Sequence, residues 1–123
     1  MNPYIIPFNK INLTHLPEVG GKNASLGEMF NKLHPLGIEV PDGFAVTVES
    51  YHHFLTHNKL GDTLKQLLNT IDSKSLSNLP EIAGQCRKLV IDAVLPDEIK
   101  NEIRKFSQFS KFSYLIFCRL SGS

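Results

Sequence analysis

The sequence predicts an α+β fold that is mostly helical, with about five helices and a few short strands. Apolar residues recur at helical spacing in several segments, whereas the apolar runs typical of strands are short. A chain of 123 residues with 41% hydrophobic residues can bury a core of its own. We therefore expect residues 1–123 to form a single domain.

The N-terminal part of the chain is expected to run from a strand through a loop to a turn. Residues 5–8 predict a short edge strand, because prolines flank their apolar side chains. Residues 12–19 are typical of a loop. The paired glycines Gly20 and Gly21 predict a turn that ends this loop.

A first helix is expected to begin at Lys22. Its apolar residues recur at helical spacing, at Leu26, Met29, Phe30 and Leu33. Residues 34–37 should end the helix, because Pro35 disfavours helical backbone in the residue before it and Gly37 accepts a positive φ.

A turn, a strand and a second helix are expected next. Residues 41–43 predict a tight turn, because Pro41 presets φ and Gly43 takes unusual backbone angles. Residues 44–46 predict a short strand. Thr47 is a good N-cap for the helix that follows it.

Three further helices are expected in the C-terminal half, at residues 60–71, 79–93 and 96–106. The last of them begins at a proline followed by two acidic residues, as helix N-termini often do. Residues 107–113 then predict a loop, and residues 114–118 a buried strand.

Composition excludes several classes of protein. A net charge of +1 with scattered basic residues argues against a nucleic-acid partner. The N-terminus lacks the pattern of a signal peptide, and no apolar run is long enough to span a membrane. Cys86 and Cys118 are far apart and are expected to be small buried apolar residues. We therefore expect a cytoplasmic protein without a membrane partner.

The histidines give no pattern of metal ligands. His53 and His57 are four residues apart and would share a helical face, but the sequence offers no evident third ligand. Surface histidines are the simpler interpretation. No catalytic residue and no metal-binding residue is assigned.

The most informative segment is residues 19–29, Val-Gly-Gly-Lys-Asn-Ala-Ser-Leu-Gly-Glu-Met. Its glycines let backbone approach an anion closely, and Lys22 places an ammonium in the first helical turn. The segment is not a Walker A loop, because Leu16 stands in place of the first glycine and Asn23 in place of Ser or Thr. Taken alone, it fits either a phosphate-binding turn or an ordinary turn with a surface lysine.

A second segment makes the first more specific. Residues 37–47 read Gly-Ile-Glu-Val-Pro-Asp-Gly-Phe-Ala-Val-Thr. Together, residues 19–29 and 37–47 resemble the N-terminal nucleotide-binding region of the phosphoenolpyruvate synthase and pyruvate phosphate dikinase family. The helix after Thr47 continues the resemblance, and residues 58–110 match mainly in helical layout.

The resemblance implies that the chain is part of an ATP-grasp fold, in which ATP lies between two subdomains. It puts Lys22, beside Gly20 and Gly21, at the phosphates of ATP. The family also has a phosphate-facing arginine in a motif like Phe-Ala-Val-Arg-Ser-Ser-Ala. Arg119 takes the place of that arginine, whereas Leu120 departs from the first serine of the motif.

ATP and Mg²⁺ are the cofactors that the resemblance implies. In the family, the carboxylates that hold Mg²⁺, the histidine that is phosphorylated and the pyruvate site all belong to segments that this sequence does not match. Pyruvate is therefore expected as a partner of the intact enzyme only.

Two functions remain open from the sequence. The chain is either an N-terminal fragment of an enzyme that makes phosphoenolpyruvate, AMP and phosphate from ATP, pyruvate and water through a phosphohistidine, or a stand-alone nucleotide-binding or protein-interaction module. The fragment is expected to be inactive by itself. In the module, the strand at residues 114–118 should be paired, within the chain or with another chain.

Overall fold

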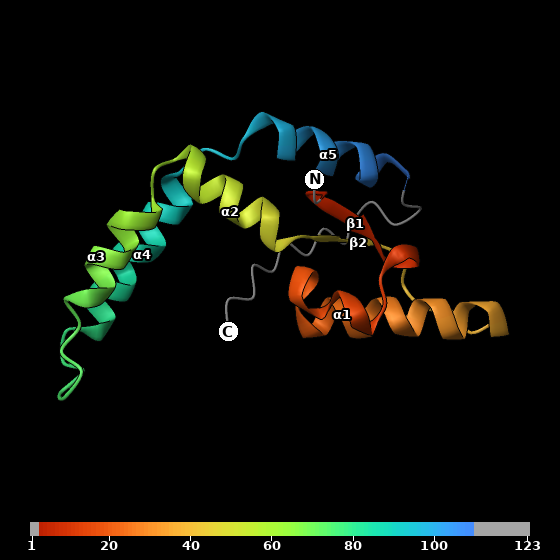
Figure 1. Ribbon diagram of the computed structural model, residues 1–123, viewed down its shortest axis with the longest axis horizontal. Helices are drawn as coiled ribbons and strands as arrows, with labels where there is room; N and C mark the ends of the chain where they lie inside the picture. Colours follow the sequence, from red (N-terminus) through yellow and green to blue (C-terminus); the bar gives the residue numbers. More distant parts are fainter. Residues whose placement is uncertain (1–2, 110–123) are drawn as a thin grey trace. The chain divides into compact units, whose positions relative to one another are not determined.

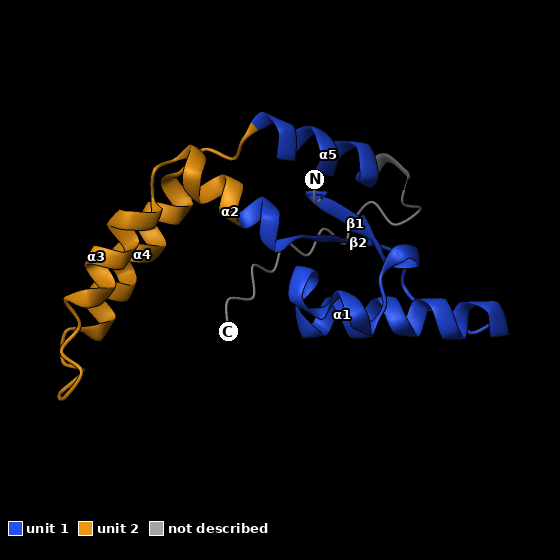
Figure 2. Ribbon diagram, in the orientation of Figure 1, with its two compact units in different colours: residues 1–51, 97–123 blue, residues 52–96 orange. Residues whose placement is uncertain are grey.

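The computed structural model describes residues 3–109, which form a mostly helical α+β structure (Figure 1). These residues contain five α-helices and one two-stranded sheet. The chain divides into two compact units, residues 52–96 and the segments on either side of them (Figure 2). We predicted that residues 1–123 form a single domain that folds on its own. The division into two compact units does not test this prediction.

The sheet of the first unit joins two segments far apart in sequence. Strands β1 (Ile5–Pro7) and β2 (Phe44–Val46) pair in antiparallel register, with Ile6 opposite Ala45. The predicted edge strand is confirmed except at Phe8, where the chain turns into a 3₁₀ turn. The Phe8 N–H donates to the carbonyl of Gly43 at 2.9 Å and so continues the pairing by one bond.

Helix α1 (Leu16–Leu33) is the longest element of the first unit. It confirms the helix expected from Lys22, but the prediction of a loop at residues 12–19 is wrong. A 3₁₀ turn (Leu13–His15) and the first turn of α1 occupy that segment instead. Asn12 makes this possible, because its side chain accepts the N–H of Thr14 at 2.9 Å. Gly37, with φ 79°, follows the helix as expected.

The buried face of α1 is made of small residues. Ala24 and Ile11 are fully buried, and Gly27 lies directly against Ile11. The core of the unit consists of Ile6, Phe8, Ile11, Val19, Ala24 and Ala45, with Phe30 packed against it. Leu26 and Met29, by contrast, are 36% and 46% exposed. Apolar spacing therefore predicted the helix but not its buried face.

Helices α2 and α5 complete the first unit. Helix α2 (Val48–His57) begins in this unit and is capped by Thr47, whose hydroxyl oxygen accepts the N–H of Ser50 at 3.3 Å. Helix α5 (Asp97–Phe109) contacts β1 through a face that includes the buried Ile99. Within this unit the sheet lies between α1 and α5 (Figure 1).

The predicted loop at residues 107–113 is wrong for residues 107–109, which continue α5. The segment contains neither proline nor glycine, so nothing in its sequence ends a helix. The predicted strand at residues 114–118 lies outside the described residues, as does Cys118.

The second unit is a helical hairpin together with the end of α2. Helices α3 (Gly61–Asn69) and α4 (Leu79–Asp92) confirm the two predicted helices. Asn58 closes the hairpin, because its side chain donates to the Val94 carbonyl at 2.8 Å and accepts the Val94 N–H at 2.9 Å. Cys86 on α4 is half-buried, less than the sequence led us to expect.

We predict that Gly27→Ala destabilises the first unit by about 1–3 kcal/mol, because a Cβ at this position would lie 2.5 Å from the Ile11 Cβ. Chemical denaturation followed by circular dichroism measures this change. Gly84→Ala on α4 is the matched control, since a Cβ there meets no atom within 4 Å. It should stabilise by about 0.5–1 kcal/mol through helix propensity. Equal effects of the two substitutions would contradict the close packing at Gly27.

Candidate functional site

The segment at residues 19–29 divides into a buried face and an exposed face. Val19, Ala24 and Gly27 belong to the buried face and pack in the core around Ile11. Packing alone accounts for these residues. A ligand would have to be sought among the side chains on the exposed face.

Gly20 separates the first turn of α1 from the rest of the helix. Its backbone angles are φ 78° and ψ 164°, which residues with a Cβ rarely adopt. Beside this break, the side-chain amide of Asn23 donates to the carbonyl of Val19 at 2.9 Å. The turn predicted at Gly20 and Gly21 is present only as a break at Gly20 inside α1, and the helix resumes at Gly21 with Lys22 in its first turn.

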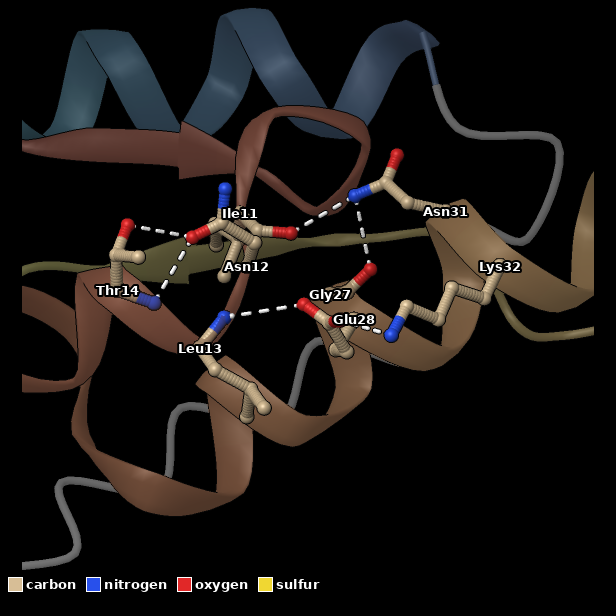
Figure 3. A network of polar contacts seen from close by, with 8 residues as sticks. All are labelled: Ile11, Asn12, Leu13, Thr14, Gly27, Glu28, Asn31 and Lys32. Atoms are coloured by element: carbon tan, nitrogen blue, oxygen red, sulfur yellow. Dashed lines mark hydrogen bonds and ion pairs between the residues drawn. The ribbon is translucent and has the colours of Figure 1, made fainter.

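A polar network ties the buried face of α1 to residues 8–13 (Figure 3). The side-chain amide of Asn31 donates to the Ile11 carbonyl at 2.8 Å and to the Gly27 carbonyl at 2.9 Å. The Leu13 N–H donates to the Glu28 carboxylate at 3.2 Å. These bonds hold the segment before α1 against the C-terminal half of the helix.

Glu28 belongs to this network. Lys32 lies 2.7 Å from its carboxylate, and that hydrogen bond, followed by the one from the Leu13 N–H, lowers the pKa of Glu28 below its ordinary value of 4.5. Residues 22 and 28 are six apart on α1 and are not neighbours on its surface, and the structure has no ion pair between Lys22 and Glu28.

The exposed face carries a shallow groove on α1. Its lining consists of Gly21, Lys22, Ser25, Leu26 and Met29. Lys22 is exposed and makes no ion pair with any residue among 3–109. The groove therefore presents one ammonium and one hydroxyl beside apolar side chains, which is a set of donors suited to an anion.

The structure brings together three of the four site residues predicted from sequence. Gly20, Gly21 and Lys22 lie at the break in α1. Arg119, the fourth, lies outside the described residues. Sequence reasoning did not assign Ser25 to the site, although a serine inside a helix is a signal that could have indicated it.

The described part of the chain holds no group of three or more His, Cys, Asp or Glu side chains that could bind a metal ion. In particular, the rings of His53 and His57 lie 6.3 Å apart on α2 without a third ligand. None of the helices among residues 3–109 is long and apolar enough to cross a membrane.

Comparison with known proteins defines the class. A sequence model of the pyruvate phosphate dikinase AMP/ATP-binding domain matches residues 16–114. The match spans most of the chain and includes both motifs, and the chain therefore belongs to this family.

The curated relatives are phosphoenolpyruvate synthases, in agreement with the resemblance seen in the sequence. The enzyme of Neisseria meningitidis serogroup B is 38% identical over 100 residues, which are 81% of this chain and 13% of that protein. The enzyme of Helicobacter pylori is 39% identical over 100 residues, 81% of this chain and 12% of that protein. The Escherichia coli enzyme is 34% identical over 110 residues, 89% and 14% respectively. The chain thus spans only 12–14% of the length of these relatives.

We predict that Glu28→Gln lowers the free energy of unfolding at neutral pH and that this loss fades in acid. The folded-state pKa of Glu28 lies below its ordinary value of 4.5, so the unfolded chain binds the proton more readily. The stabilisation by the carboxylate is therefore complete above pH 4.5 and is lost as the pH falls through and below that value. Urea titrations of wild type and variant from pH 3 to pH 7, about one unit apart, measure this difference.

Glu39→Gln is the control, because Glu39 is exposed and accepts no hydrogen bond from residues 3–109. Its free energy of unfolding at neutral pH should equal that of wild type. A difference between Glu28→Gln and wild type that stays constant from neutral pH into acid would contradict the role assigned to the Glu28 carboxylate.

Proposed function

We propose that this chain is the N-terminal part of the nucleotide-binding domain of a phosphoenolpyruvate synthase, in which Lys22 binds the phosphates of ATP. The observation that carries the proposal is the division of residues 19–29 into two faces. Packing explains Val19, Ala24 and Gly27, whereas Lys22 is exposed in a groove without an acidic partner among the described residues.

The electrostatics of the groove support an anionic ligand. Lys22 is a compact positive charge that makes no ion pair with any residue among 3–109. The ammonium is therefore available to phosphate oxygens. Gly21 lines the same groove and carries no side chain that would keep a ligand from the backbone.

Gly20 and Arg119 have different parts in this proposal. Gly20 acts through its positive φ, which breaks the helix so that it restarts at Gly21, one residue before Lys22. Arg119 is proposed as a second, bidentate donor to the triphosphate, because a guanidinium matches phosphate geometry. Mg²⁺ is proposed to arrive with ATP and to be held by parts of an ATP-grasp domain other than residues 3–109.

The reaction proposed for the whole enzyme converts ATP, pyruvate and water to phosphoenolpyruvate, AMP and phosphate through a phosphohistidine, in the cytoplasm. Phosphoryl transfer depends on positioning and on neutralising charge at the transferred group. This chain would supply one cation of that arrangement, at Lys22. The acceptor histidine and the pyruvate site are proposed to lie in the remainder of such an enzyme.

We predict that ATP with Mg²⁺ perturbs the backbone amide signals of residues 20–26 in an NMR titration of the chain. Lys22→Gln should raise the dissociation constant about tenfold or more, because it removes a charge-assisted hydrogen bond. Lys32→Gln, on the same helix but outside the groove, should bind like wild type. Wild-type signals that do not move, or equal losses for the two variants, would contradict the proposed role of Lys22.

We also predict that the chain by itself does not form AMP from ATP in a pyruvate-dependent manner. It has one proposed side of a nucleotide cleft and no assigned acceptor residue. A coupled assay with purified chain tests this, with Lys22→Ala as the background. Turnover above that background would show that the chain is a complete enzyme and would refute the fragment interpretation.

A further inference from the structure

Besides Lys22, the groove on α1 contains a second polar side chain, Ser25, which has no part in the proposed function. Among the five residues that line it, Lys22 and Ser25 carry the only side-chain hydrogen-bond donors. The other three are a glycine, Leu26 and Met29. For a polar ligand held by Lys22 in this groove, the hydroxyl of Ser25 is the other side-chain donor among the lining residues.

Local structure gives no reason for a serine at this position. Ser25 lies inside α1, where serine is a poorer helix former than alanine. It is exposed, and its hydroxyl makes no hydrogen bond to any residue among 3–109, not even to a carbonyl of the preceding turn. Neither capping nor packing accounts for it, in contrast to Asn23 and Ala24 beside it.

The spacing of the two side chains suits one extended anion. Residues three apart on a helix are neighbours on its surface, with Cβ atoms about 5–6 Å apart. Lys22 and Ser25 are three apart, and both line the same groove. A chain of linked phosphates can contact both side chains at once, with the ammonium neutralising charge and the hydroxyl donating a directed hydrogen bond.

We infer that Ser25 is a second phosphate-binding residue, whose hydroxyl donates to a phosphate oxygen of the nucleotide that Lys22 holds. This inference rests on the proposed function and extends it from a single cation to a two-residue cradle. The side chain binds the nucleotide directly and is not needed for the fold.

The experiment compares affinity with stability in the same variants of the 123-residue chain. Isothermal titration with ATP and Mg²⁺ should give a dissociation constant for Ser25→Ala that is about tenfold higher than for wild type. The midpoint of thermal unfolding of Ser25→Ala should be equal to or above that of wild type, since alanine favours the helix. Ser25→Thr keeps a hydroxyl and should retain most of the wild-type affinity.

Two controls show whether Ser25 contacts the phosphates and which of the two proposals fails. Adenosine, which has no phosphates, should bind wild type and Ser25→Ala equally. If Lys22→Gln weakens ATP binding and Ser25→Ala does not, the inference about Ser25 is wrong and the proposed function stands. If neither substitution weakens binding, or wild type binds no ATP, both are wrong. Loss of affinity in Ser25→Ala together with a lower unfolding midpoint would also overturn the inference, because it would indicate a structural role.

Discussion

The contact between Ile11 and Gly27 is the constraint on which the first unit depends. Ile11 is fully buried, and a Cβ on Gly27 would lie within 2.6 Å of both its side chain and its carbonyl oxygen. The segment that leaves β1 therefore crosses α1 at a distance that only glycine permits. Asn31 reinforces the crossing through bonds to the Ile11 and Gly27 carbonyls. This approach sets which face of α1 is buried.

The buried face of α1 determines which of its side chains are left exposed to a ligand. With Ala24 and Gly27 turned toward the core, Lys22 and Ser25 are left on the exposed side of the helix. Ridges of large side chains usually hold helices in place, but here small residues do so, and the larger Leu26 and Met29 are half-exposed and line the groove. The same close packing that stabilises the unit thus leaves the cation and the hydroxyl open to a ligand.

The break at Gly20 likewise affects both the fold of α1 and the position of Lys22. It ends the first turn of α1 and restarts the helix at Gly21, so that Lys22 lies near a helix start although helical residues precede it. Asn23 compensates the break by donating to the Val19 carbonyl. A residue with a Cβ at position 20 would be strained, since the backbone there has φ 78°. The local geometry of the proposed site therefore depends on two neighbouring residues, a glycine and an asparagine.

The sequence by itself determined the helices, the turn at Gly20, the capping by Thr47 and membership in the nucleotide-binding family. These follow from local spacing, backbone preference and motif, which do not require knowledge of distant contacts. The helical turns within residues 12–19 and the extension of α5 to Phe109 were not predicted, although Asn12, Pro17 and Glu18 are helix-start signals and residues 107–109 contain no helix breaker. Only the tertiary structure decided that Leu26 and Met29 are exposed and that Ser25 shares a groove with Lys22. The physical reason is that α1 buries the face that Ile11 can approach most closely. Small residues such as Gly27 allow that approach.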